Sequence, residues 1–185
     1  MKVLYQHNTD AGARYRLLAD SSILLPGRPF FMPEWASFIS VTPVIALRVD
    51  RLGKHIAPRF AHRDWQHLAP AFISTGLDTQ GQPVEQGALS EAFDGALMLG
   101  EWVKKEQIAS EATLVTTCKN SSWLCENVSH TLAQADDMVA HISRHMTLKM
   151  GDVLCVGLRS SRLISVGDTV TAALGNHQTL TINIK

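Results

Sequence analysis

Residues Phe38 to Val49 have the sequence FISVTPVIALRV, the strongest strand signal in the first half of the chain. β-Branched and other apolar residues dominate this stretch, and the turn sequence RLGK follows it at residues 51–54. Pro43 has no backbone N–H and removes one donor from a hydrogen-bond ladder. We therefore predict a long strand whose beginning lies at an edge, a bulge or a bend.

The segments on either side of this stretch favour further strands and few helices. Ala61 to Leu68 has a polar pattern compatible with a helix, and Asp78 to Gly87 is polar enough to form an exposed loop. One helix is predicted from about Thr131 to Met146, where apolar residues recur every three or four positions. Short strands are expected within Ser22 to Pro33, at Ala71 to Thr75, Ala96 to Val103 and Glu111 to Cys118, and at Asp152 to Gly157, Thr169 to Ala173 and Thr179 to Ile184. These patterns indicate a β-rich α+β fold and no function.

The composition excludes several classes of protein. The 185 residues suit one ordinary domain, and 17 basic residues balance 17 acidic ones, so no overall field favours nucleic acid or an anionic membrane. No apolar run approaches the roughly 20 residues that span a bilayer, and the N-terminus lacks a signal-peptide pattern. The three cysteines form no CxxC pair and are expected to be reduced. We predict one domain over residues 1–185, in the cytoplasm, without nucleic-acid or membrane partners.

Three segments, in order along the chain, carry a resemblance to a known family. They are SILLPGRPFFMP at Ser22 to Pro33, the AFDG and LGEW sequences at residues 92–95 and 99–102, and TLKMGD at Thr147 to Asp152 with VGD at residues 166–168. Together they resemble the fumarylacetoacetate hydrolase family over roughly Asp20 to Lys185, whereas residues 1–19 match poorly. The resemblance implies a β-roll of mixed strands with one main packed helix, commonly as a homodimer.

The same resemblance implies a metal site whose side chains this sequence lacks. The family holds Mg²⁺ or Mn²⁺ with a Glu-x-Glu pair and a later aspartate, because a hard divalent ion prefers oxygen ligands. A lysine two residues before the Phe-Asp-Gly segment helps to position the metal-bound water or the substrate. Thr42 and Val44 stand at the two glutamate positions, Ile73 at the aspartate and Glu91 at the lysine, and Leu158 replaces the threonine of a substrate-binding Gly-Thr-Pro turn. The family's lid, with its acid/base His and Glu, has no clear counterpart.

Three functional hypotheses remain open. In the first, the chain is a catalytically inactive protein that resembles the fumarylacetoacetate hydrolase family and needs no cofactor. Its scaffold then serves binding or assembly, as a homodimer or beside an active paralogue. In the second, Asp78, Glu91 and Asp94 hold a relocated Mg²⁺ or Mn²⁺, and the protein is a hydrolase, isomerase or decarboxylase of small 2-oxo or 1,3-dicarbonyl acids. In the third, the site binds a neutral or cationic small molecule without metal, because Glu91 replaces a positive charge by a negative one. The assigned register requires that Thr42, Val44, Ile73 and Glu91 lie together.

Overall fold

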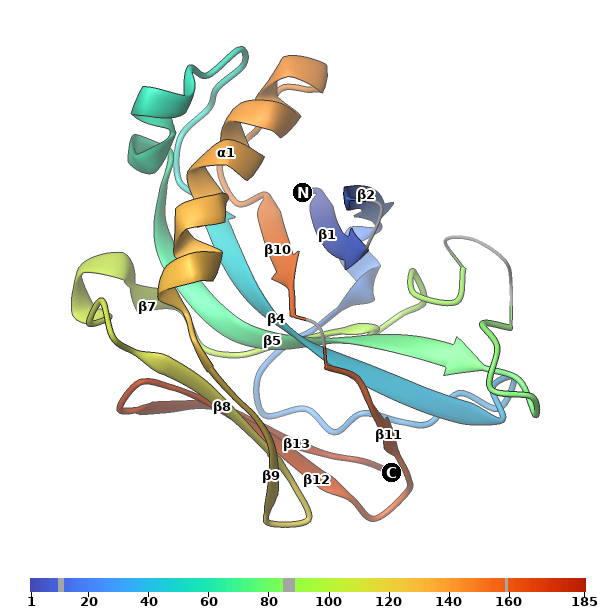
Figure 1. Ribbon diagram of the computed structural model, residues 1–185. Coiled ribbons are helices and arrows are strands. Elements are labelled where there is room, and N and C mark those ends of the chain that lie inside the picture. Colours follow the sequence, from blue (N-terminus) through green and yellow to red (C-terminus); the bar gives the residue numbers. More distant parts are fainter. Residues whose placement is uncertain (10–11, 85–88, 159) are drawn as a thin grey trace.

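The computed structural model describes residues 1–9, 12–84, 89–158 and 160–185 (Figure 1). A nine-stranded mixed sheet curls into a roll, and a four-stranded antiparallel sheet packs beneath it. The β-rich α+β fold with one main helix is thereby confirmed. The strands of the large sheet are β1 (Val3–Thr9), β2 (Gly12–Leu18), β3 (Ile23–Leu24), β4 (Phe38–Val49), β5 (Trp65–Leu77), β6 (Leu97–Leu99), β7 (Val103–Lys104), β10 (Val153–Gly157) and β11 (Arg162–Ile164).

The smaller sheet and the helices complete the architecture. The smaller sheet has the order β13-β12-β8-β9, and α1 (Ser129–His145) connects its edge strand β9 to the segment that leads into β10. Among the described residues, no helix is both long enough and apolar enough to cross a membrane. The remaining elements are β8 (Thr113–Cys118), β9 (Ser121–Asn127), β12 (Thr169–Leu174), β13 (His177–Asn183) and the short 3-10 helices η1 (Asp20–Ser22), η2 (Pro58–Arg63) and η3 (Lys105–Gln107).

Strands β4 and β5 form the centre of the large sheet, and each contains a proline beside a gap in the neighbouring strands. The Pro43 carbonyl accepts the N–H of Leu158 at 3.0 Å, where β10 has ended and β11 has not begun. The Pro70 carbonyl accepts the N–H of Gly100 at 3.0 Å, between β6 and β7. The N and C=O of one strand residue point toward the same neighbouring strand. Each proline nitrogen therefore faces the break between β10 and β11 or between β6 and β7, and the β4–β5 ladder loses no hydrogen bond.

The structure corrects the sequence prediction at these strands. β4 has the predicted bounds, but its beginning pairs with both β5 and β11 and is therefore not an edge. The segment Ala61 to Leu68 is helical only up to Arg63, where the 3-10 helix η2 ends, and β5 begins at Trp65. Pairing with β4 along its whole length and the burial of the Trp65 side chain override the polar local pattern. The stretch Ala96 to Val103 forms two short strands, β6 and β7, in place of one.

The indole of Trp65 anchors the main helix to β5. Its Nε1 donates a hydrogen bond to the Asp136 carboxylate of α1 at 2.8 Å, and the Lys105 ammonium lies 3.7 Å from the ring centroid. The helical face that carries Met138 and Val139 is buried against the core, as the apolar spacing predicted. This attachment holds α1 beside the roll.

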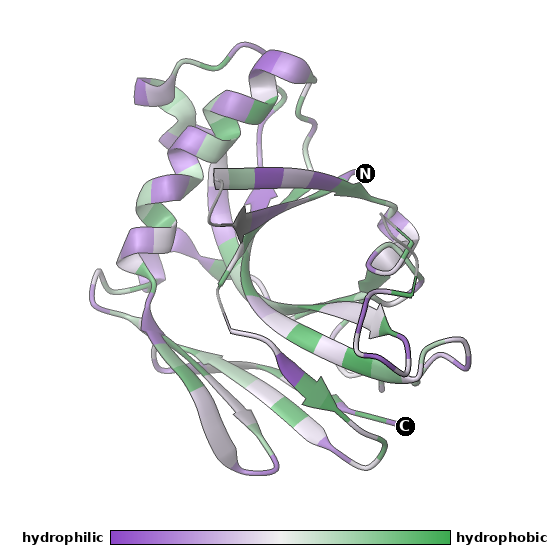
Figure 2. Ribbon diagram, turned by 45° about the vertical axis from the view of Figure 1, so that its right-hand side comes forward, coloured by the Kyte–Doolittle hydropathy of each residue, from purple (hydrophilic) through white to green (hydrophobic). Residues whose placement is uncertain are grey.

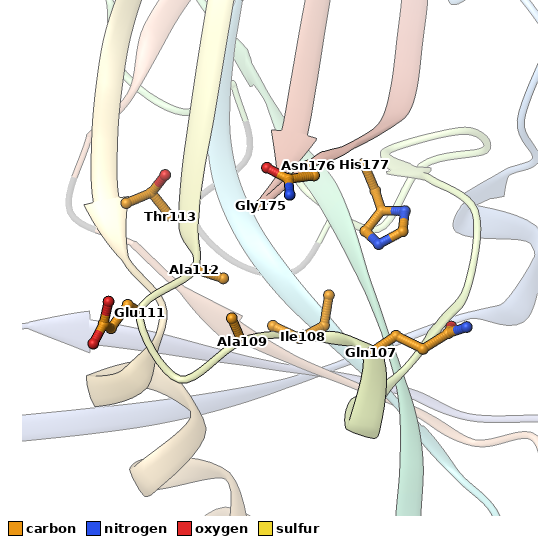
Figure 3. Close-up of a pocket in the computed structure, with 9 residues that line it drawn as sticks. All are labelled: Gln107, Ile108, Ala109, Glu111, Ala112, Thr113, Gly175, Asn176 and His177. Atoms are coloured by element: carbon orange, nitrogen blue, oxygen red, sulfur yellow. The ribbon is translucent and has the colours of Figure 1, made fainter.

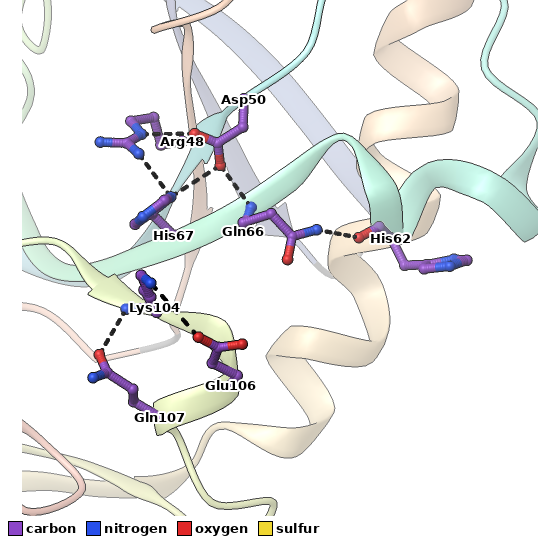
Figure 4. A network of polar contacts seen from close by, with 8 residues as sticks. All are labelled: Arg48, Asp50, His62, Gln66, His67, Lys104, Glu106 and Gln107. Atoms are coloured by element: carbon purple, nitrogen blue, oxygen red, sulfur yellow. Dashed lines mark hydrogen bonds and ion pairs between the residues drawn. The ribbon is translucent and has the colours of Figure 1, made fainter.

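A polar network joins the end of β4 to the beginning of β5 (Figure 4). The Arg48 Nε donates to Asp50 at 2.9 Å, and the other Asp50 oxygen accepts the N–H of Gln66 at 2.7 Å and lies 3.1 Å from His67 Nδ1. Burial alone would raise the pKa of Asp50, but the hydrogen bonds from His67, the Gln66 N–H and Arg48 outweigh it and lower that pKa. The network therefore holds a carboxylate in its charged form at this junction.

The two Gly-Asp pairs of the C-terminal motif form the same turn twice. Gly151 and Gly167 have φ of +86° and +89°, a conformation that favours glycine. The N–H of Asp152 and of Asp168 each donates to the carbonyl three residues earlier at 3.0 Å. Each carboxylate also accepts the N–H of that earlier residue, at 2.8 Å and 3.0 Å respectively. In this structure, the Gly-Asp motif that carries much of the family resemblance thus forms two hydrogen-bonded turns.

The two faces of the large sheet belong to different cores. The outer face packs against α1 and the smaller sheet through large side chains such as Leu47 and Phe72. Figure 2 shows how the large sheet curls into the roll, and the residues on its inner face form a second core. Its buried members are Val3, Tyr5, Leu18, Val44, Ala46, Ala69, Ala71, Ile73, Leu97, Leu99, Val153 and Cys155.

An N-terminal hairpin, β1 with β2, closes one side of the roll and was not predicted from the sequence. β1 pairs in parallel with β10, and β2 pairs antiparallel with β1 at the end of the sheet. The Tyr15 ring of β2 stacks on His141 of α1 with the centroids 5.1 Å apart. The next residue, Arg16, points to the opposite face of the hairpin and reaches the inside of the roll.

Candidate functional site

The four positions that the resemblance assigns to metal and lysine lie on the inner face of the roll. Thr42 and Ile73 are directly opposite each other in the β4–β5 ladder. Val44 is two residues further along β4 and therefore lies on the same face. Thr75, two residues beyond Ile73, donates its hydroxyl hydrogen bond to Glu91 at 3.3 Å. The structure brings these positions together, as the assigned register requires.

Apolar side chains dominate this part of the inner face. Val44 and Ile73 are buried and pack with Leu97 and Ala71, while Thr42 is half-buried. A valine and an isoleucine offer no atom that could ligate a metal, and a threonine offers one neutral hydroxyl. The donor set that remains here therefore does not fit Mg²⁺ or Mn²⁺.

Leu158 does not join the other four positions. Gly157 lies opposite Val44 in the β10–β4 ladder and faces the inside of the roll. The next side chain, that of Leu158, consequently points to the other face, where it packs in the core shared with the smaller sheet. Arg159, the third residue of the turn, lies outside the described residues.

Glu91 is a charged group at this face, and its counter-ion comes from the N-terminal hairpin. Glu91 is only 6% exposed, and its carboxylate forms an ion pair with the Arg16 guanidinium of β2. The Arg16 side chain is 38% exposed, so the guanidinium reaches a buried acid from the solvent side. The charge reversal at the lysine position is thus matched by a basic residue 75 positions away in the sequence.

Tyr5 lies opposite Arg16 in the hairpin and covers Gly157. A β-carbon on Gly157 would come within 2.8 Å of the Tyr5 ring. Burial raises the pKa of Tyr5 well above its usual range, and the negative charge of Glu91 adds to the rise, so the phenol keeps its proton. Sequence reasoning missed Tyr5 and Arg16 because both lie within residues 1–19, where no motif marks them.

The other two candidate carboxylates do not share this environment. The Asp78 carboxylate accepts the N–H groups of Gln80 and Gln82 at 2.8 and 2.9 Å and organises the loop that follows β5. Asp94 is exposed in the turn before β6, beside a surface cavity of about 400 Å³ that Phe30 and Phe31 also line. Within the described ranges, no three side chains of His, Cys, Asp or Glu are grouped so that they could hold a metal ion.

Another cavity, of about 270 Å³, lies between η3 and the β12–β13 turn (Figure 3). Figure 3 shows its carboxylate, Glu111, and its imidazole, His177, on opposite sides, so they form no catalytic pair. The lining residues are Gln107, Ile108, Ala109, Glu111, Ala112, Thr113, Gly175, Asn176 and His177. None of them belongs to the inner face of the roll.

Replacing Gly157 by alanine is expected to lower the free energy of unfolding by about 1–3 kcal/mol, because the new methyl group overpacks the roll. It would meet the Gln6 carbonyl oxygen at 2.8 Å as well as the Tyr5 ring. Removing the ring with Tyr5→Ala should therefore not restore stability in the double variant. Urea unfolding of the three variants tests this, and an unchanged midpoint for Gly157→Ala would show that the backbone adjusts freely.

The curled mixed sheet, the site on its inner face and the two Gly-Asp turns are features by which this chain can be compared with known protein families. Residues 20–185 match the family model described as fumarylacetoacetate (FAA) hydrolase C-terminal. The chain therefore belongs to the fumarylacetoacetate hydrolase family. Tyr5 and Arg16 precede the matched residues.

Individual proteins resemble the chain in sequence or in fold, with little sequence identity. A mitochondrial oxaloacetate tautomerase of Rattus norvegicus is 25% identical over 140 residues, which are 74% of this chain and 45% of that protein. The chain thus spans less than half the length of this relative. A 5-carboxymethyl-2-hydroxymuconate delta-isomerase from Mycobacterium smegmatis matches with a TM-score of 0.86 and 22% identity, over 99% of this chain and 76% of its own. A fumarylpyruvate hydrolase from Pseudomonas aeruginosa, in complex with Mn²⁺ and pyruvate, matches with a TM-score of 0.84 and 13% identity. The match covers 100% of this chain and 89% of that protein's chain.

Proposed function

We propose that this chain is a family member without metal-dependent catalysis, whose roll serves binding or assembly. The observation that carries the proposal is the identity of the inner-face residues: Thr42, Val44 and Ile73 occupy one face at the positions assigned to three carboxylate ligands. Losing those carboxylates removes the charge that makes binding of a hard divalent ion favourable. Assembly as a homodimer or with an active paralogue belongs to the same proposal.

The state of Glu91 supports this proposal. A relocated metal site built on Asp78, Glu91 and Asp94 would need their carboxylates to converge on one ion. Glu91 is already neutralised by Arg16, Asp78 accepts backbone N–H groups of its own loop, and Asp94 is exposed in a turn. Each carboxylate therefore has an environment that accounts for it without a metal.

A metal-free small-molecule site is the second candidate function, and the burial of Glu91 favours it. A carboxylate is costly to bury unless a specific interaction repays the loss of hydration. The buried carboxylate lies beside the hydroxyl of Thr75, at a sheet face whose core residues are mostly apolar. Such a combination of apolar surface with few placed polar groups is typical of ligand sites.

Isothermal titration calorimetry of Mg²⁺ and of Mn²⁺ into the chelator-treated protein tests the leading proposal. We expect no site of micromolar affinity, because three of the family's oxygen ligands are replaced. Turnover of oxaloacetate and of an acylpyruvate should be absent in the same preparations. The fumarylpyruvate hydrolase from Pseudomonas aeruginosa is the matched control for metal binding. A stoichiometric heat signal together with turnover would end the proposal.

A further inference from the structure

We propose that Glu91 anchors a binding site for a small molecule that carries a guanidinium or primary ammonium group, and that Arg16 of the same chain occupies this site when no ligand is bound. The inference rests on the proposed function, in that it assigns the roll a binding role without metal. It goes further by naming the recognition group, the class of ligand and the intramolecular competitor.

The first argument is the charge requirement of Glu91. It lies next to Thr75 of β5, and the strand face that continues from Thr75 to Ile73 and its ladder partner Leu97 is buried and apolar. Thr75 supplies one neutral hydrogen bond at 3.3 Å, which is too weak to replace the hydration of a carboxylate. A cation close to Glu91 therefore stabilises its charged form, and in this structure Arg16 supplies that cation.

The second argument is the way in which Arg16 is attached. It lies on β2, an end strand of the large sheet, whose one partner among the described strands is β1. Between residues 12 and 17 the side chains of this strand are exposed or half-buried, and only Leu18 is buried. Strands with few buried contacts open locally at low free-energy cost. The guanidinium of Arg16 can consequently leave Glu91 without unfolding of the roll.

The third argument is space. Arg16 reaches Glu91 from the solvent side, since its own side chain remains 38% exposed while Glu91 is 6% exposed. The volume that its guanidinium and outer methylenes fill is therefore a path from solvent to the buried carboxylate. A ligand guanidinium of the same shape fits that path once Arg16 has swung out.

The chemistry around Glu91 selects the class of ligand. With Arg16 displaced, the site carries the negative charge of Glu91, which excludes anions. The Thr75 hydroxyl oxygen, like the carboxylate, can accept N–H bonds. A guanidinium or a primary ammonium has several such donors, whereas a quaternary ammonium has none. The site should thus bind methylguanidinium or agmatine and should not bind tetramethylammonium.

Calorimetric titration of methylguanidinium and agmatine into wild-type protein and Arg16→Ala tests the inference, with chelator present throughout. We expect saturable binding to Arg16→Ala that is roughly tenfold or more tighter than to wild type, because the wild-type chain must first displace its own arginine. The melting temperature of Arg16→Ala should rise with ligand concentration. Arg14→Ala is the matched control, since Arg14 lies on the same strand and is exposed. It should behave as wild type.

The double variant Arg16→Ala with Glu91→Gln should lose the binding, because the recognition charge is gone. Arg16→Gln serves in place of Arg16→Ala if the alanine variant does not fold, since it keeps much of the side-chain stem. Binding that survives Glu91→Gln, equal binding to wild type and Arg16→Ala, or a response to tetramethylammonium would each overturn the inference. Because every one of these titrations contains chelator, they do not report on metal binding. A failure here therefore leaves the proposed absence of metal-dependent catalysis to be tested by the Mg²⁺ and Mn²⁺ titrations.

Discussion

Glu91→Lys is expected to lower the free energy of unfolding by about 2–3 kcal/mol, although it introduces the residue type that the family resemblance assigns to this position. The substitution breaks the ion pair with Arg16 and places two positive charges together beside a buried, apolar face. The figure is below that for a fully buried pair, because Arg16 is 38% exposed and water screens part of the repulsion. Urea unfolding with far-UV circular dichroism measures the loss.

The reciprocal exchange provides the control for this prediction. Arg16→Glu combined with Glu91→Lys restores opposite charges, and the double variant should regain most of the stability lost in Glu91→Lys. Arg14→Glu combined with Glu91→Lys is the matched comparison, because it adds the same charge to the same strand at an exposed position. An equal recovery in both double variants would mean that net charge, and not the pair with Arg16, governs the effect.

Asp152→Ala is expected to cost about 3–4 kcal/mol, because it removes several hydrogen bonds at once from a buried position. The carboxylate accepts the N–H groups of Lys2 and Lys149, both at 2.8 Å, and pairs with the Lys2 ammonium. It therefore ties the start of β1 to the turn before β10, as well as closing that turn. Asp94→Ala, at an exposed aspartate in another turn, should change stability by no more than about 0.5 kcal/mol. Similar losses in both variants would contradict the assignment.

The stabilising effect of Asp152 should depend on pH in a defined direction. Burial by itself would raise the pKa of Asp152, but the hydrogen bonds from the Lys2 side chain and from the Lys149 and Lys2 N–H groups outweigh it and lower that pKa. A carboxyl whose pKa is lower in the folded state stabilises the fold above its unfolded pKa of about 3.9 and loses this contribution as the pH falls further. The stability difference between wild type and Asp152→Asn should hold at neutral pH and shrink below about pH 4.

The measurement is the urea midpoint of both proteins over this pH range at constant ionic strength. Asp50 and Asp168 also have lowered pKa values through their own hydrogen bonds, and both titrate in each of the two proteins. Subtracting the Asp152→Asn curve from the wild-type curve isolates the contribution of Asp152. A difference that grows on acidification would show that the Asp152 pKa is raised in the folded state.

Much of the fold could be predicted because the decisive signals are local. The bounds of β4 follow from the apolar, β-branched run itself, and α1 follows from apolar residues recurring every three or four positions. The Gly-Asp turns need glycines with positive φ and aspartates that accept nearby N–H groups, so neighbouring residues encode them. Ala71 to Thr75 was predicted as a strand, but the first part of β5 was not. Its pairing with β4 and the burial of Trp65, which no local pattern reveals, outweigh a polar sequence there.

For the site, the motifs along the sequence were enough to assign Thr42, Val44, Ile73 and Glu91 to the ligand and lysine positions of the family, because aligned motifs fix positions along the chain. The fold was needed to show that Thr42, Val44 and Ile73 share one face, that Glu91 reaches Thr75 beside them, and that Leu158 points to the other face. The side to which a strand residue points depends on register, and a contact from a turn depends on the folded chain. The partner of Glu91 was equally out of reach of the sequence. Arg16 lies 75 residues away on a strand that no motif marks, and an ion pair between distant residues forms only when folding brings them together.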